Sequence, residues 1–168
     1  MFIGPLPEVL RNIQEDGRSN EEIIAALEVG YVSVFHKDIF TRDTELLPPA
    51  ATVYQFLGVS CRELPKDLRR LGAERIFAAV TQEHGNLEKP SLRSALLLME
   101  RMAQKHLWAD IVVMNEAVPC HDGSPVLICL GHEDEEGVPW VAAVGTDYDF
   151  PHDSELLLFL ADPLAQAA

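Results

Sequence analysis

The chain has 168 residues and a formal net charge of −14, because 27 acidic residues outnumber 13 basic ones. This length suits one domain with a substantial core. The charge argues against nucleic-acid binding, which needs a basic face, and against docking to anionic lipid. No apolar run approaches the ~20 residues that span a bilayer, and the three cysteines have no disulfide-framework spacing. The N-terminus also lacks the pattern of a secretory signal, so we expect a cytoplasmic protein.

The N-terminal part of the chain carries helical patterns. Residues 5–16 place apolar side chains at helical spacing. Ser19 followed by Glu22 is a capping-box pattern that opens a second helix, which Gly30 would end. We therefore expect a helical hairpin over residues 1–30.

The middle of the chain, residues 31–109, is predicted to be mainly helical. Its first five residues, YVSVF, are typical of a strand. Residues 48–58 begin with two prolines and are predicted to form a helix. Residues 74–80 fit either structure, and a strand is favoured there. The clearest helix begins at Ser91 and has a wide apolar stripe.

Short apolar runs separated by polar loops fill the C-terminal part, residues 110–163. Residues 111–118, 126–131, 140–145 and 155–161 are predicted to be strands. Helices come first and a mostly antiparallel sheet comes last, which indicates an α+β fold in a single domain, 1–168.

Four pieces of the chain resemble a known family. TELLPPAATVYQFLGV, residues 44–59, is similar to the helix that begins with the nucleophilic cysteine in bacterial double-glycine leader peptidases, which process bacteriocins. PVLICLG, PWVAAVGTD and LLLFLADP are similar, in order and spacing, to the C-terminal strands of these papain-like cysteine peptidases. The resemblance covers about two-thirds of the chain. It implies a papain-like fold, with N-terminal helices packed on the sheet.

The two catalytic side chains of that family have no counterpart here. Leu47 stands where the resemblance places the nucleophile, and Pro139 stands in place of the catalytic histidine. Asp149 or Asp162 falls where the orienting residue would be, with no imidazole to orient. Because catalysis of this type needs a thiolate beside a proton-accepting ring, the resemblance implies the scaffold without its chemistry.

A thiol, an imidazole and a carboxylate are adjacent in the sequence at one place, which consists of Cys120, His121 and Asp122. Neighbouring side chains usually diverge, and a catalytic cysteine is better placed at a helix start than before a strand. A histidine could still come to Cys120 through the fold (His36, His84 or His132). The fallback catalytic set is therefore Cys120, His121 and His132.

A zinc site could be drawn from Cys129 and His132 with Cys120, His121 and His152. That set lacks the two close ligand pairs of a structural zinc site, and Cys129 lies inside an apolar run. The acidic turn HEDEE lacks the alternating spacing of a calcium loop. We therefore expect neither a metal nor another cofactor.

The loop after residue 145 is the best polar cluster for contacting a partner. Its carboxylates and aromatic rings could recognise a basic peptide, although they are also common turn residues. The candidate partner-binding residues are Trp140, Asp147, Tyr148, Asp149 and His152.

Three functional hypotheses follow from the sequence. The first is a non-catalytic papain-like domain that binds a protein or peptide. The second is a cysteine hydrolase or acyltransferase that uses Cys120 as its nucleophile. The third is an acidic inhibitor or immunity protein that masks a basic enzyme.

Overall fold

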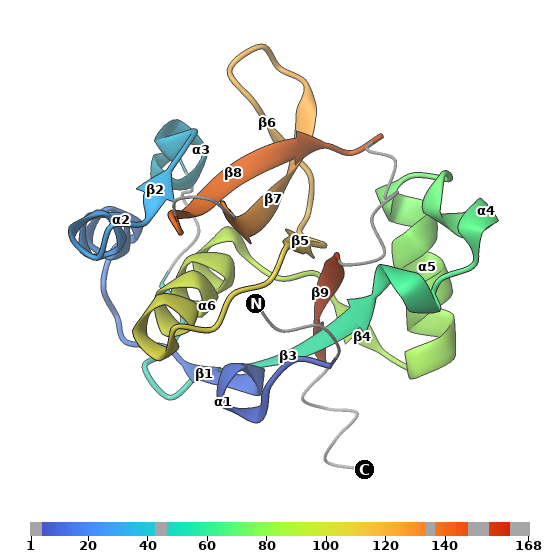
Figure 1. Cartoon of the computed structure of the whole chain (residues 1–168), viewed down its shortest axis with the longest axis horizontal. Coiled ribbons are helices and arrows are strands. Elements are labelled where there is room, and N and C mark those ends of the chain that lie inside the picture. The colour runs from blue at the N-terminus through green and yellow to red at the C-terminus, as the bar shows by residue number, and fades with distance from the viewer. Residues whose placement is uncertain (1–4, 43–46, 134–136, 148–154, 162–168) are drawn as a thin grey trace.

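The protein is a mixed α+β fold built on one large, mostly antiparallel sheet (Figure 1). This structure is a computed structural model that describes residues 5–42, 47–133, 137–147 and 155–161. Its strands are β1 (Asn12–Gln14), β2 (Ser33–Val34), β3 (Val53–Ser60), β4 (Leu87–Glu88), β5 (Ile111–Val113), β6 (Val118–Pro119), β7 (Pro125–His132), β8 (Pro139–Gly145) and β9 (Leu156–Ala161). Its helices are α1 (Glu8–Arg11), α2 (Asn20–Val29), α3 (Lys37–Thr41), the short 3-10 helix η1 (Cys61–Glu63), α4 (Lys66–Arg69), α5 (Ala73–His84) and α6 (Leu92–Lys105).

The strand order within the described residues is β1-β3-β9-β5-β7-β8-β2, with β4 also paired to β9 and β6 also paired to β7. Two pairs are parallel, β2 with β8 and β5 with β9, and the other pairs are antiparallel. The longest ladder joins β7 to β8. Strand β2 therefore lies at one end of the sheet, where only two of its residues pair with β8.

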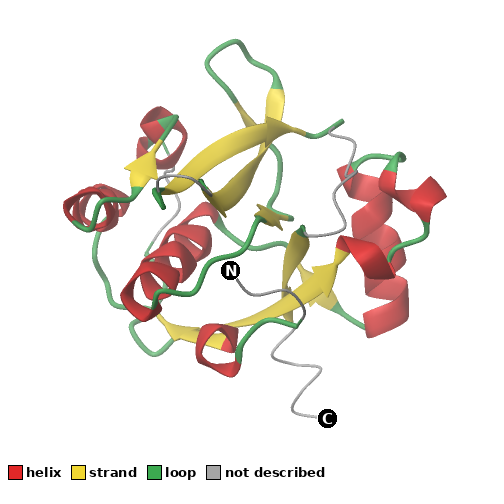
Figure 2. Cartoon of the chain, in the orientation of Figure 1, coloured by secondary structure: helices red, strands yellow, loops and turns green. Residues whose placement is uncertain are grey.

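Helices pack against both faces of the sheet (Figure 2). Along β9, Leu156 and Leu158 belong to one core cluster, whereas Leu157 and Phe159 belong to the other. This alternation follows from the two-residue period of a strand. The first cluster contains side chains of α1, α2, α3 and α6, and the second contains side chains of η1 and α5. No helix among the described residues is long and apolar enough to cross a membrane.

Helix starts that depend on local capping are confirmed. The Ser19 side chain accepts a hydrogen bond from the Glu22 backbone N–H, and the Glu22 carboxylate accepts one from the Ser19 backbone N–H. Ser91 likewise accepts from the Ser94 N–H at the start of α6, at 3.1 Å. The expected helical hairpin over residues 1–30 is correct for α2. It is wrong for the first segment, where α1 is one turn long and leads into β1.

Two elements of the middle segment have the opposite secondary structure to the prediction. Residues 48–58 were predicted to be a helix, but β3 occupies 53–60. There Tyr54 and Phe56 enter one core cluster and Val59 enters the other, as strand periodicity requires. Residues 74–80 were predicted to be a strand but lie in α5, which buries Ile76 and Val80 four residues apart.

The sheet also extends beyond the predicted C-terminal part. The strands predicted between residues 110 and 163 are present as β5, β7, β8 and β9. However, two strands from the first sixty residues join the same sheet, since β3 pairs with β9 and β1 pairs with β3. Residues 31–109 are therefore not purely helical, because β2, β3 and β4 lie within them.

Candidate functional site

The turn between β6 and β7 brings two neighbouring side chains together. The Cys120 N–H donates to the Ser124 carbonyl at 2.8 Å, and the Gly123 N–H donates to the Cys120 carbonyl at 2.9 Å. Gly123 has a φ of +84°, which glycine adopts without strain. Because Cys120 and His121 enter a turn instead of continuing a strand, their side chains converge. The Cys120 Sγ lies 3.4 Å from the His121 Nδ1. The expectation that these neighbours would diverge is wrong.

A third donor reaches this turn from a distant part of the chain. His36 lies between β2 and α3, where it precedes the first residue of α3 and has a left-handed backbone conformation with a φ of +55°. Helix α3 is held near the turn because the Arg42 Nη2 donates to the Pro119 carbonyl at 3.0 Å. As a result, His36, Cys120 and His121 each offer one ligand atom, and these three atoms all lie within 4.8 Å of one another. We call these three residues the Cys–His cluster.

The Cys–His cluster lies at the surface. Both histidines are exposed, whereas Cys120 is half-buried against the first core cluster. Two hollows of the described surface, about 690 and 370 Å³ in volume, are lined by other residues. The cluster is therefore open to solvent instead of lying in either hollow.

A charged carboxylate accompanies the cluster. The Asp122 Oδ1 accepts hydrogen bonds from the Ser124 backbone N–H at 3.0 Å and from the Ser124 hydroxyl. These two bonds, with a smaller contribution from His121, lower the pKa of Asp122. Asp122 is therefore ionised at neutral pH and adds negative charge beside His121.

The donor types of the cluster fit a transition-metal ion, and its donor atoms, which lie within 4.8 Å of one another, would draw closer around one. Zinc binds thiolate sulfur at about 2.3 Å and imidazole nitrogen at about 2.0–2.1 Å, so its tetrahedral ligands lie about 3.4–3.6 Å apart. The 3.4 Å separation of Sγ and Nδ1 already matches this spacing. Three protein ligands would leave the fourth position open, as in catalytic zinc sites.

The other predicted catalytic residue, His132, is not part of this cluster. It ends β7, at the opposite end of that strand from the turn. Its ring stacks on Trp108 with 5.3 Å between ring centroids and 19° between ring planes. His84, which was also considered, ends α5 and lines the larger hollow. The structure therefore places Cys120 with His121 and His36, not with His132.

The predicted partner-binding residues are only partly described. Trp140 lies in β8 opposite Gly131 of β7, and its ring covers that glycine. Asp147 is exposed just after β8. Three residues fall outside the described part of the chain (Tyr148, Asp149 and His152).

The two positions at which the resemblance places the catalytic residues of the peptidases lie in or ahead of different strands. Leu47 is exposed ahead of β3, and Pro139 is buried at the start of β8. The segment that the resemblance aligned with a helix is β3. No protein-family model, curated protein or solved structure matches the chain.

Proposed function

We propose that this protein binds a divalent transition-metal ion, Zn²⁺ as the best fit, through His36, Cys120 and His121. The observation that carries the proposal is the convergence of one sulfur donor and two imidazole donors within 4.8 Å. The contact between Cys120 and His121 arises within one turn, but His36 arrives from the other side of β8. Thiolate and imidazole favour zinc and its neighbours over Mg²⁺ and Ca²⁺, which prefer oxygen. The proposal replaces the expectation that the chain binds no metal.

The metal would join two segments, one containing β2 and α3 and the other the β6–β7 turn, which the bond from Arg42 to Pro119 already connects. Strand β2 pairs with β8 through two residues, and the Phe35 N–H adds one bond to the Val141 carbonyl at 2.8 Å. A metal held by His36 on one side and by Cys120 and His121 on the other cross-links β2 and α3 to the β6–β7 turn. Binding to the folded state alone stabilises that state by about 2.7 kcal/mol when free metal is 100 times Kd. We assign the metal this organising role.

A second candidate is a nucleophilic Cys120 with His121 as its base, which the 3.4 Å contact favours. Such an enzyme also needs an orienting group for the imidazole, oxyanion donors and a site for substrate. The Asp122 Oδ1, on the carboxylate next to His121 in sequence, already accepts two hydrogen bonds from Ser124. Metal binding needs none of these features, so it is the better-supported function.

The papain-like scaffold and a protein partner stay proposals alongside metal binding. Strands β7, β8 and β9 follow one another as the resemblance implies, which supports the scaffold. The strand conformation of β3 counts against it. The net charge of −14 supports a basic partner, whether as a binding target or as a masked enzyme.

The test is zinc titration of the metal-free full chain by calorimetry, with His36→Ala, Cys120→Ser and His121→Ala beside the wild type. We expect one zinc per chain and at least ~100-fold weaker binding in each variant, since even a residue behind a ligand is worth ~10–100-fold. His132→Ala is the matched control and keeps wild-type affinity. Absence of saturable binding, or an equal loss in His132→Ala, contradicts the proposal. Circular dichroism of each variant separates lost binding from lost folding.

A further inference from the structure

We infer that Cys120 is an oxidation-sensitive metal ligand, so that hydrogen peroxide converts its thiolate to a sulfenic acid and releases the bound metal. This inference rests on the proposed metal binding and adds how that site is regulated. It follows from the contrast between Cys120 and the other two cysteines of the chain.

Cys61 and Cys129 are poorly placed to react. Cys61 lies in η1 with 0% of its surface exposed. Cys129 lies in β7 between Ile128 and Leu130, whose side chains enter the first core cluster, so its own side chain points to the opposite face. Burial, followed by the charges of Glu155 and Asp110, raises the pKa of the Cys129 thiol to about 12. Only the thiolate is an effective nucleophile, so the raised pKa protects Cys129 at neutral pH, whereas Cys61 is protected by its burial.

Cys120 differs from both in its neighbours. Like Cys129 it is half-buried, but it lies in a surface turn with the donor atoms of two exposed imidazoles within 4.8 Å. A thiol that coordinates a metal ion is held as the thiolate. Because Cys120 is only partly buried in this surface turn, a molecule as small as hydrogen peroxide has access to the sulfur. Metal binding therefore keeps the Cys120 sulfur in the thiolate form that an oxidant attacks.

The oxidation step is a two-electron displacement. A sulfur lone pair of the Cys120 thiolate attacks one oxygen of hydrogen peroxide, so that an S–O bond forms as the O–O bond breaks. The sulfur is oxidised by two electrons, and hydroxide leaves and takes up a proton to become water. The sulfenic acid no longer supplies a thiolate ligand. His36 and His121 alone then hold the metal, and it dissociates.

The oxidised state is reversible by external thiols. Cys61 is buried in the second core cluster, and the half-buried Cys129 points to that same face of the sheet. Cys120 packs against the first cluster instead, so neither residue is placed to form an internal disulfide with it. A small thiol instead condenses with the sulfenic acid, releasing water and forming a mixed disulfide. A second thiol then reduces this disulfide and restores Cys120. Oxidation would therefore open the cross-link between α3 and the β6–β7 turn, and reduction would close it.

The experiment treats the zinc-loaded full chain with increasing hydrogen peroxide. Released zinc is measured with a chromogenic chelator, and sulfenic acid is trapped with dimedone and located by mass spectrometry. We expect one zinc released per Cys120 oxidised, modification of Cys120 at least ~10-fold faster than of Cys129, and renewed zinc binding after dithiothreitol. Cys129→Ala is the control and behaves as the wild type.

The outcomes separate this inference from the proposed function. Zinc that stays bound while Cys120 is oxidised overturns the inference and leaves metal binding intact. Oxidation of Cys129 before Cys120 also overturns it. So does zinc release by peroxide from chains whose Cys120 remains reduced. A chain that binds no zinc before peroxide is added overturns both.

Discussion

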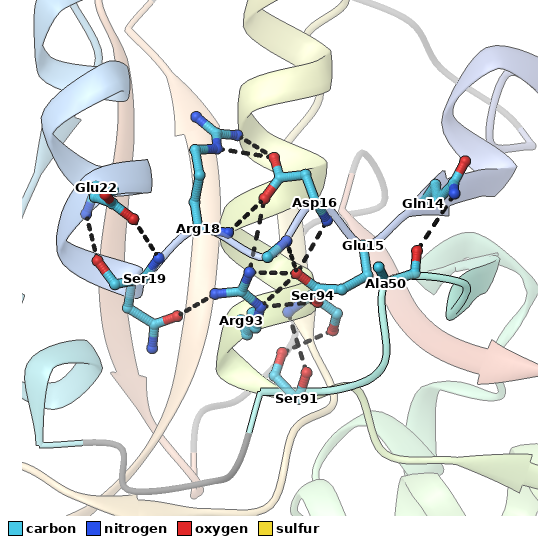
Figure 3. Close-up of polar contacts among 12 residues, drawn as sticks. Gln14, Glu15, Asp16, Arg18, Ser19, Glu22, Ala50, Ser91, Arg93 and Ser94 are labelled. Atoms are coloured by element: carbon cyan, nitrogen blue, oxygen red, sulfur yellow. Dashed lines mark hydrogen bonds and ion pairs between the residues drawn. The ribbon is translucent and has the colours of Figure 1, made fainter.

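Arg93 of α6 and Glu15, in the turn after β1, form a buried ion pair that fastens the N-terminal segment to the central helix (Figure 3). The Arg93 Nε donates to the Glu15 Oε2 at 2.8 Å and to its Oε1 at 2.9 Å, and Nη2 also donates to Oε1. The Tyr54 hydroxyl of β3 donates to Oε2 at 2.8 Å. The two side chains are 6% and 0% exposed. One carboxylate therefore joins α6, β3 and the turn that leads into α2.

Removing the charge of Glu15 should destabilise the fold strongly. Glu15→Gln leaves the Arg93 guanidinium buried without its carboxylate, and breaking a buried pair in this way typically costs about 3–5 kcal/mol. Urea denaturation measures the change in the free energy of unfolding. Asp38→Asn is the control, because Asp38 pairs with Arg42 at the surface and should contribute at most about 1 kcal/mol. Equal losses in the two variants would contradict the importance given to burial.

The same carboxylate predicts how stability depends on pH. Hydrogen bonding from Arg93 is the largest cause that lowers the pKa of Glu15 from 4.5 to about 2. Because the folded pKa is depressed, the stabilisation is complete above pH 4.5 and is lost as the pH falls toward 2. At about 1.4 kcal/mol per pKa unit, the full loss is about 3 kcal/mol. Denaturation of the wild type and Glu15→Gln at pH 6 and pH 3 should show their stabilities converging at the lower pH. A constant difference would be inconsistent with this pKa.

Local signals in the sequence identified the elements whose formation depends on near neighbours. The capping box at Ser19 and the cap at Ser91 each involve hydrogen bonds between residues no more than three apart in the sequence. The starts of α2 and α6 could therefore be predicted. Residues 48–58 were misassigned because two prolines and a terminal glycine suit a helix start and end. The tertiary structure instead uses Tyr54 and Phe56 on one face of the sheet.

The candidate site was only half visible in the sequence. Cys120 and His121 could be singled out because they are adjacent, but their convergence depends on the turn that Gly123 and Ser124 close. His36 could be considered only as one of several histidines. Its place beside Cys120 depends on the position of α3 over the sheet, including the bond from Arg42 to Pro119. No spacing rule connects residues so far apart in the chain.

Gly131 should be intolerant of any side chain. A Cβ at this position would overlap with the Trp140 ring, which lies across it from the paired strand. Gly131→Ala should displace the indole and cost about 1–3 kcal/mol, as overpacked sites do. Denaturation and Trp140 fluorescence in a Trp108→Phe background would measure both effects. Gly30→Ala provides the comparison, because Gly30 has a φ of −81° and a Cβ there would approach no atom closer than 3.4 Å. An unaltered Trp140 spectrum in Gly131→Ala would refute the packing described.

The second core cluster depends on an aromatic pair. Phe159 of β9 is 0% exposed, and its ring centroid lies 5.8 Å from that of Phe77 in α5. Phe159→Ala should lower the free energy of unfolding by about 3–5 kcal/mol through lost burial and a cavity. Phe35→Ala removes an exposed ring of the same kind and should change stability by no more than about 0.5 kcal/mol. Similar effects at both positions would contradict the assignment of α5 to this face.

The absorption spectrum of the full chain loaded with Co²⁺ examines the metal site most directly, because cobalt reports both the ligand type and the coordination geometry. The account predicts a sulfur-to-cobalt charge-transfer band and tetrahedral d–d bands that saturate at one equivalent. Cys120→Ser should abolish the charge-transfer band, and His36→Ala should weaken cobalt binding. A spectrum of hydrated cobalt at every ratio, or a sulfur band unaffected by Cys120→Ser, would contradict the account.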